Sequence, residues 1–293
     1  MTAREIPRVT PYVDMGHYPT PSLSQLSQES GLRGFSLGFI TGIDCRASWF
    51  GVHDPRSGWQ RDEIARLRNA GGEVRISFGG AKGLELARTC ADEAALAAEY
   101  NAVVQAYGLT HLDVDIEKEA LHDEASIHRR SRALAMVQRD NPGLRISLTL
   151  PVSPTGLTEQ GMAVVRSAQE AGVVIDVVNV MTMHFGQPTS DVGKLAIQAA
   201  QATHEQLRTL HPDRSDAELW RMLGVTALLG RSPITGEMFD RNAARVLVEF
   251  AEKVQLGMLA FWEMGLDRNA VADPPQEPYE FSRIFAGFAD RNR

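Results

Sequence analysis

The residues best suited to chemistry lie in one short run, 111–117, which reads HLDVDIE. In a β-strand the side chains alternate between two faces, so Asp113, Asp115 and Glu117 would share one face. Like charges and burial both disfavour ionisation, so at least one of these carboxyl groups is expected to hold a proton near neutral pH. Glu117, at the carboxyl end of the run, is then suited to general acid catalysis, with Asp115 able to hydrogen-bond to it.

Two other interpretations of the run involve no proton transfer. The strand could lie at the surface with its acidic face solvated, or its carboxylates could bind Mg²⁺ or Ca²⁺, which prefer oxygen ligands. The catalytic interpretation gains weight from the place of the run within the whole chain. It predicts a site without metal or cofactor.

Eight short apolar or β-branched runs alternate with longer amphipathic runs, and the acidic run is the fourth of the eight. The expected strands are 9–14, 34–39, 73–78, 111–116, 145–150, 174–183, 222–228 and 257–262. The expected helices are 22–30, 61–69, 92–107, 125–140, 158–171, 192–210, 240–253 and 278–290. This alternation predicts an α/β fold, a (β/α)8 TIM barrel, whose active site lies at the carboxyl ends of the strands.

A doubly wound open sheet is the alternative fold. It normally carries a glycine-rich phosphate turn after its first strand, whereas here that segment, 16–21, reads GHYPTP. No linker rich in Pro, Gly or Ser divides the chain, so residues 1–293 are expected to form one domain. No large α+β insertion separates the seventh and eighth expected strands, which predicts a shallow, open groove.

Composition narrows the possible partners. The chain has 293 residues, 43% of them hydrophobic, and a net charge of −7. The acidic balance argues against a nucleic-acid or anionic-membrane partner, and no run of about 18 apolar residues is present to span a bilayer. Residues 1–8, MTAREIPR, lack the apolar stretch of a signal peptide. We therefore expect a cytoplasmic protein, with a secreted mature form as the alternative and the oligomeric state left open.

The acidic run resembles the DxDxE signature of family 18 glycoside hydrolases, the chitinases and related enzymes. The longer segment 107–117, YGLTHLDVDIE, is similar especially to bacterial chitinases. Other segments resemble the strands of that family in the same order: SFGG at 77–80 the third, SLTLP at 147–151 the fifth, VNVMTM at 178–183 the sixth, 226–230 the seventh and 261–262 the eighth. The resemblance covers nearly the whole chain.

This resemblance implies a role for each carboxylate. Glu117 would protonate the glycosidic oxygen, Asp115 would orient the acetamido group whose carbonyl oxygen attacks the anomeric carbon, and Asp113 would tune Asp115. Trp262 would form the aromatic floor of the sugar site; an ordinary core aromatic is the alternative. The other residues expected in the substrate site are Tyr12, Asp14, Ser77, Gly79, Met181, Met183 and His184.

Two departures from the family pattern bear on function. After Met183 the subgroup usually continues Asp-Tyr, but here His184 and Phe185 follow; His184 can exchange hydrogen bonds and titrate near neutrality. After Glu117 the family tends to have glycine, but here Lys118 follows. A lysine beside the acid would favour its ionised form; the alternative is a solvated side chain that points away.

The cysteines do not decide the compartment. Cys45 and Cys90 can be one disulfide or two thiols. They lie near positions where secreted relatives are expected to carry cysteines, so a disulfide is possible, in tension with a cytoplasmic location.

Three functions remain. The first is a glycosidase that cleaves soluble β-1,4-linked N-acetylglucosamine oligomers with retention. The second is a repurposed enzyme of the same fold that uses Glu117, Asp115 and His184 in proton transfer on a different small molecule, such as a biosynthetic intermediate. The third is a carbohydrate-binding protein without activity, although such proteins generally lose the acid that this chain keeps.

Overall fold

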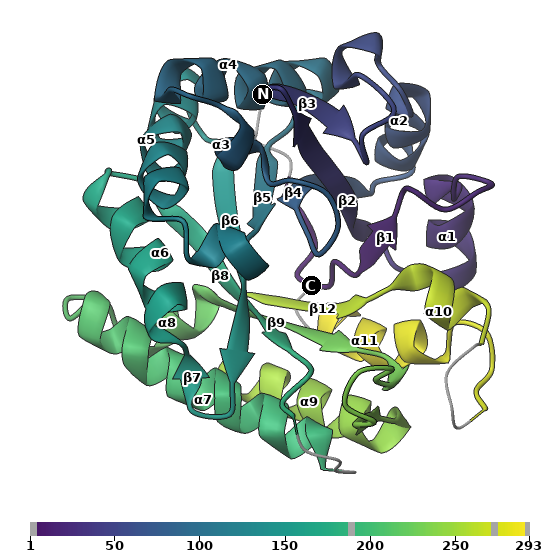
Figure 1. Cartoon of the computed structure of the whole chain (residues 1–293). Coiled ribbons are helices and arrows are strands. Elements are labelled where there is room, and N and C mark those ends of the chain that lie inside the picture. Colours follow the sequence, from purple (N-terminus) through teal and green to yellow (C-terminus); the bar gives the residue numbers. More distant parts are fainter. Residues whose placement is uncertain (1–4, 187–190, 271–274, 291–293) are drawn as a thin grey trace.

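The computed structural model describes residues 5–186, 191–270 and 275–290. In this part of the chain, eight parallel strands stand side by side, and a ring of helices surrounds them (Figure 1). In spatial order they are β1 (Tyr12–Asp14), β2 (Gly34–Ile43), β4 (Glu73–Gly79), β5 (His111–Asp115), β6 (Arg145–Ser153), β8 (Ile175–Thr182), β9 (Leu223–Leu228) and β12 (Met258–Trp262).

The first and last strands close the sheet into a barrel. The backbone N–H of Thr10 donates to the carbonyl of Leu259 at 3.0 Å, and the N–H of Leu259 donates to the carbonyl of Arg8 at 2.8 Å. Val9 and Leu259 form a parallel bridge between these two hydrogen bonds. The expected (β/α)8 barrel is therefore confirmed, and all eight strands have their carboxyl ends at one end of it.

The alternation of residues along β5 separates an apolar face from a polar one. Leu112 and Val114 are fully buried in the apolar core, as is Ile116 just beyond the strand. Asp113 and Asp115 occupy the opposite face and are also buried, since this face is turned toward the interior of the barrel. The strand thus places its carboxyl groups where the cost of charge is high.

Capping residues mark the ends of several helices. In α4 (Glu93–Tyr107), the Asp92 side chain accepts a hydrogen bond from the N–H of Ala95, and Gly108 ends the helix in the left-handed conformation. The remaining long helices are α1 (Leu23–Ser30), α2 (Arg61–Asn69), α5 (Glu124–Asp140), α6 (Glu159–Glu170), α7 (Val192–Leu210), α9 (Arg241–Val254) and α11 (Glu280–Asp290). None of the helices within the described ranges is long and apolar enough to cross a membrane.

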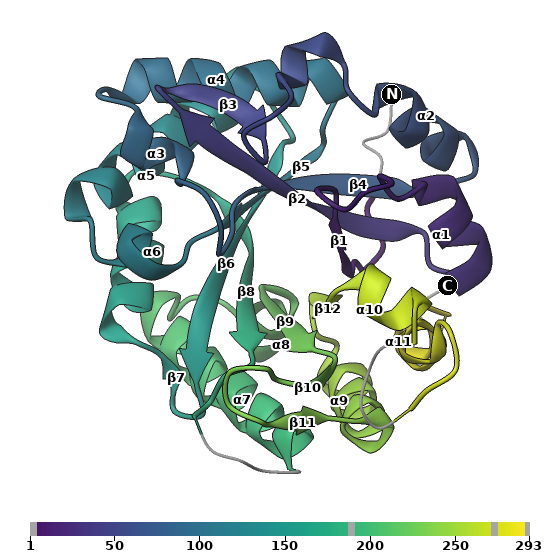
Figure 2. The ribbon, with the colours of Figure 1, turned by 45° about the vertical axis from the view of Figure 1, so that its right-hand side comes forward.

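The elements that the sequence did not predict are all short. They comprise β3 (Arg46–Trp49), β7 (Gly156–Leu157), β10 (Gly230–Arg231), β11 (Met238–Phe239), α3 (Leu86–Thr89), α8 (Asp216–Arg221), α10 (Met264–Arg268) and the 3-10 turns η1 (Pro55–Ser57) and η2 (Lys118–Leu121). Between β9 and β12 lie only the β10–β11 hairpin and α9, which Figure 2 shows side by side. The expected absence of a large insertion there is confirmed.

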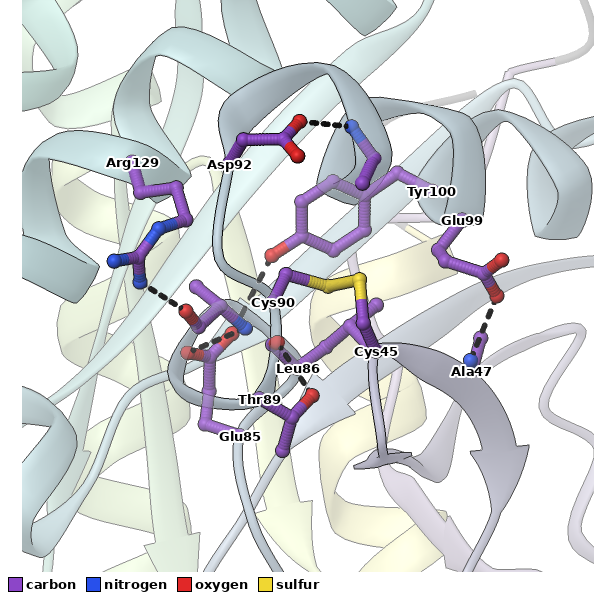
Figure 3. The surroundings of a disulfide bond; sticks show 12 residues. Cys45, Ala47, Glu85, Leu86, Thr89, Cys90, Asp92, Glu99, Tyr100 and Arg129 are labelled. Carbon is purple, nitrogen blue, oxygen red and sulfur yellow. Dashed lines mark hydrogen bonds between the residues drawn. A yellow bond between two sulfur atoms is a disulfide. The ribbon is translucent and has the colours of Figure 1, made fainter.

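Cys45 and Cys90 form a disulfide (Figure 3). Cys45 lies in the turn between β2 and β3, and Cys90 directly follows α3, so the bond ties together two loops at the carboxyl end of the barrel. Disulfides are typical of oxidising compartments and favour the secreted alternative. The cytoplasmic location stays a prediction.

Candidate active site

Asp113 lies at the centre of a buried hydrogen-bond network. Its Oδ2 accepts hydrogen bonds from the hydroxyls of Tyr12 at 3.1 Å and Ser77 at 2.5 Å. Its Oδ1 accepts from Ser147 at 2.5 Å and Thr149 at 2.9 Å. Four hydroxyl donors thus satisfy both oxygens of a carboxyl group that has no exposure to solvent.

Asp115 is in the opposite situation. Its side chain is only 3% exposed, and Oδ1 has no hydrogen-bond partner in the part of the chain that the structure describes. Burial, followed by the charges of Glu117 and Asp113, raises the pKa of Asp115 well above its usual range. The environment of Asp115 therefore favours the protonated carboxyl group, which can donate a hydrogen bond.

Gly79 lets β4 come close to Asp115. A Cβ at this position would lie 2.1 Å from the carbonyl oxygen of Asp115, and the φ angle of +98° is one that glycine tolerates. The next residue, Gly80, donates its backbone N–H to the same oxygen at 3.1 Å. Gly79, predicted as a substrate-site residue, thus lies against the backbone of a catalytic candidate.

Glu117 lies just beyond the end of β5 and is half-buried. Burial raises the pKa of Glu117, and the positive charge of Lys118 opposes that rise. The Nζ of Lys118 donates a hydrogen bond at 2.6 Å to the carbonyl of Ala81, in the loop after β4. The lysine is therefore anchored to this loop and close enough to influence the acid, and the net result is still a carboxyl group whose pKa is raised.

Three aromatic rings gather beside the carboxylates at the carboxyl end of the barrel. Trp262, at the end of β12, is half-buried and stacks on Phe39 with the ring centroids 5.6 Å apart and the planes 13° apart. Tyr12 packs against both, at 5.9 Å from Trp262 and 6.0 Å from Phe39. A stacked, partly accessible indole offers an apolar face of the kind on which a sugar ring can pack.

Tyr12 and Ser77 are connected to the carboxyl groups of the site by their hydrogen bonds to Asp113. Both are buried, and burial followed by the charges of Asp113 and Asp115 raises the pKa of Tyr12 well above its usual range, so Tyr12 remains a donor. Asp14, at the end of β1, accepts a hydrogen bond from the N–H of Gly16 at 2.9 Å. These contacts place Tyr12 and Ser77 beneath the carboxyl groups and Asp14 at the rim.

The residues predicted from the sixth strand lie further round the barrel. Met181 and Met183 are half-buried at the end of β8, and His184 is exposed. The Nδ1 of His184 lies 2.9 Å from the hydroxyl of Ser232, which follows β10. Burial lowers the pKa of His184, and the charge of Glu237 partly opposes this. The described contacts of His184 join it to the β10–β11 hairpin rather than to Glu117.

Sequence reasoning missed the hydroxyl and amide groups that support Asp113. Asn179 donates to Thr149 at 3.0 Å and accepts from Thr226 at 3.0 Å, so neighbouring strands share one network. The only sequence signal for these residues was a polar residue at alternate positions of otherwise apolar strands.

A second missed group braces the loop after Glu117. Arg130, on α5, is buried and forms a 3.0 Å ion pair with Glu85. The same guanidinium lies 3.5 Å from the carbonyl of Ala120, in the turn after the acid. Tyr100 donates to Glu85 at 3.3 Å (Figure 3). These buried groups hold the loop after β4, which contains Glu85, against the turn after β5, which contains Ala120.

The site therefore combines a fully hydrogen-bonded Asp113, two carboxyl groups of raised pKa, Asp115 and Glu117, and an aromatic platform. Such a set can donate a proton, stabilise a developing positive charge and hold an apolar sugar face. Among the described residues, no group of three or more His, Cys, Asp and Glu side chains is arranged to hold a metal ion.

Comparison with known proteins identifies this arrangement. No family model matches the chain. It is 34% identical to the "Probable bifunctional chitinase/lysozyme" of Escherichia coli over 95% of this chain and 34% of that protein, and 35% identical to endochitinase 11 of Metarhizium anisopliae over 89% of this chain and 52% of that protein. The chain thus spans about a third to a half of these relatives.

Solved structures extend the likeness over whole domains. The catalytic domain of a hyperthermophilic chitinase from Pyrococcus furiosus is 31% identical, covers 98% of this chain with 96% of its own length, and superposes with a TM-score of 0.88. A family 18 chitinase from Pseudoalteromonas aurantia shares the fold at 18% identity and a TM-score of 0.64. The fold and the identity to these chitinase domains place the chain among the (β/α)8 glycoside hydrolases. The chain belongs to family 18, the chitinases.

Proposed function

We propose that this protein hydrolyses soluble β-1,4-linked N-acetylglucosamine oligomers by substrate-assisted catalysis with retention, and that Glu117 is the general acid. The observation that carries the proposal is the pair of carboxyl groups of raised pKa, Asp115 and Glu117, above a fully hydrogen-bonded Asp113. A raised pKa keeps a proton on the acid at the pH at which it must be donated.

In the first step Glu117 gives its proton to the glycosidic oxygen as the bond to the anomeric carbon breaks. The acetamido carbonyl oxygen of the same sugar attacks that carbon, and an oxazolinium ion forms. Asp115 releases its proton to bulk water as substrate binds and, as a carboxylate, accepts a hydrogen bond from the acetamido N–H and stabilises the positive charge. Water then attacks the anomeric carbon while the bond from this carbon to the acetamido oxygen breaks and the acetamido group is restored; Glu117 takes the proton of the water, and the configuration is retained.

The substrate class follows from the relatives and the aromatic platform. The relatives are named as chitinases, and mutants of the Pyrococcus furiosus domain are described in complex with chito-oligosaccharides. The stacked Trp262 and Phe39 would hold the apolar face of one sugar above the carboxyl groups.

A matched pair of variants tests the proposal with a chromogenic chitobioside. Glu117→Gln removes the acid and should lower kcat by about 10²–10⁴-fold, the usual contribution of a general acid. Glu119→Gln changes an exposed carboxylate two residues away and should leave kcat unchanged. No turnover by the wild type, or equal turnover by Glu117→Gln, would contradict the proposal; sugar binding without hydrolysis would point to a binding protein instead.

A second candidate keeps the same acid chemistry for a different small molecule. Its specific support is His184, exposed at the end of β8 and hydrogen-bonded to Ser232, where the subgroup usually has aspartate. If chito-oligosaccharides are the substrate, His184→Ala should change KM for them. Unchanged kinetics on these oligomers, together with loss of another metabolite conversion in both His184→Ala and Glu117→Gln, would favour the second candidate.

A further inference from the structure

The opposite end of the barrel contains a basic cavity. Its volume is about 320 Å³, and it lies among the amino ends of the strands, farthest along them from Glu117. Arg145 begins β6, Arg75 is the third residue of β4, and Arg221 precedes β9. The charged groups that line the cavity are Glu5, Arg8, Arg75, Arg145, Asp176 and Arg221.

The charges of this cavity do not balance. Four guanidinium groups face two carboxylates, although the whole chain carries a net charge of −7. Arg145 lies 4.0 Å from Asp176, and Arg8 donates to the side-chain oxygen of Gln255 at 3.3 Å. Burial lowers the pKa of Arg8, and repulsion from the positive charge of Arg221 lowers it further. Arginine stays charged in proteins, so this cluster cannot relieve its repulsion by losing protons.

A buried arginine forms the inner wall of the cavity. Arg75 is 3% exposed; its Nη1 donates to Ser147 at 3.2 Å and lies 3.0 Å from the sulfur of Met258, but its Nε has no hydrogen-bond partner in the described ranges. The nearby Nε2 of His111 is likewise buried without a partner. Unsatisfied donors are costly inside a protein, and a bound acceptor at this position would satisfy the arginine.

We propose that this cavity binds a phosphoryl dianion, either inorganic phosphate or the phosphate group of a small monoester. Guanidinium groups match the oxygen geometry of phosphate and bind it through paired, charge-assisted hydrogen bonds. The excess of two positive charges equals the charge of the dianion. The cavity lies at the lower end of the size range of small-molecule sites, so a phosphate with a small organic group also fits.

The site is separate from the proposed glycosidase chemistry. Arg75, Ser147 and Asp113 form a polar column inside the barrel, in which Ser147 contacts both of the other two side chains. Arg75 is the member of this column nearest the amino ends of the strands. Arg8, Arg145 and Arg221 belong to the amino ends of the strands, whereas Asp115, Glu117 and Trp262 belong to the carboxyl ends. Phosphate binding can therefore be tested whether or not the protein cleaves chito-oligosaccharides.

Calorimetric titration of the full chain with inorganic phosphate, against sodium chloride at equal ionic strength, tests the proposal. We expect saturable binding of phosphate and a dose-dependent rise in Tm, with neither produced by chloride. The double variant Arg8→Gln/Arg221→Gln should weaken phosphate binding at least tenfold. The control Arg139→Gln, which removes an exposed arginine paired with Asp140 outside the cavity, should bind like the wild type.

A second variant separates loss of phosphate binding from loss of folding. Arg145→Gln replaces an arginine whose side chain is 48% exposed, so it should fold normally, and it too should weaken binding. Glucose 6-phosphate distinguishes the two sources of the dianion: tighter binding than inorganic phosphate indicates a monoester, and weaker binding indicates the free ion. Phosphate heat and Tm no different from chloride, or equal phosphate affinity in the wild type and both arginine variants, would overturn the proposal.

Discussion

The two ends of this barrel carry opposite charges and manage them differently. At the carboxyl end, burial raises the pKa of both Asp115 and Glu117, and the neighbouring carboxylates raise that of Asp115 further, so the protonated forms are favoured. At the amino end, Arg8, Arg75 and the neighbouring arginines stay positively charged, so only a negative charge from another group can balance them. Buried carboxyl groups can thus become proton donors, whereas clustered arginines, which do not lose their protons, favour the binding of an anion.

A polar column connects the two ends. Ser147 donates a hydrogen bond to Asp113 and accepts one from Arg75, so the buried negative and positive groups share one hydroxyl. Burial lowers the pKa of Arg75, and the negative charge of Asp113 opposes this. Asp113 therefore stabilises the barrel as well as the site, and removing it should have the largest effect on folding.

Asp113→Ala should lower the free energy of unfolding by about 3–5 kcal/mol, because it leaves four buried hydroxyl groups without their acceptor and removes a negative charge that acts on buried Arg75. Urea unfolding measures this. Asp176→Ala, at the amino end, removes a part-exposed carboxylate and should cost no more than about 1 kcal/mol. Equal losses in the two variants would contradict the contrast between the two ends.

The disulfide braces only the carboxyl end. Cys45→Ser/Cys90→Ser should lower the free energy of unfolding by about 2–4 kcal/mol, because the bond closes a long loop, with its cysteines 45 residues apart. Urea unfolding in oxidising and reducing buffer provides the check. Reductant should lower the free energy of unfolding of the wild type and leave that of the double variant unchanged. An equal free energy of unfolding of the wild type in both buffers would show that the disulfide does not contribute to stability.

Asp115→Asn should lower kcat for a chitobioside about 100-fold, or about 2.7 kcal/mol of transition-state stabilisation, since an amide cannot become the anion that stabilises the oxazolinium ion. Steady-state kinetics measure the loss. Asp14→Asn, at the rim, is the matched control and should change KM more than kcat. A kcat within threefold of the wild type for Asp115→Asn would remove this residue from the mechanism.

The fold and the acidic end of the barrel could be predicted from the sequence, whereas the basic end could not. The eight strands and the eight long helices were predicted with ends shifted by at most four residues, because apolar alternation and capping residues are local signals. The run that holds Asp113, Asp115 and Glu117 was found for the same reason. The cysteine pairing was left open, since spacing alone does not decide it.

The missed features depend on contacts between distant segments. Phe39 reaches Trp262 only because the barrel closes and brings β12 beside β1. The short β10–β11 hairpin, which fixes His184, carries too few residues to show a period. The basic cavity gathers arginines that are scattered along the chain, and no local pattern marks them.

The smallest expected effect concerns Lys118. Glu117 acts when protonated, so activity should fall as pH rises through its pKa, and the charge of Lys118 lowers that pKa. Lys118→Met should therefore raise the pKa and move the alkaline limb of the kcat profile to higher pH. Lys194→Met, an exposed lysine paired with Asp191, should leave the profile in place. An unmoved or downward-shifted limb in Lys118→Met would show that this lysine does not tune the acid.

The central claim is that Glu117 donates a proton and the substrate's own acetamido group acts as nucleophile, with retention. Proton NMR of chitotetraose in the first minutes of hydrolysis tests this most directly, because it shows the anomer before mutarotation. We expect the new reducing end to appear first as the β-anomer, and Glu117→Gln to give no product on this timescale. Initial release of the α-anomer, or the same β-anomer at an unchanged rate from Glu117→Gln, would contradict it.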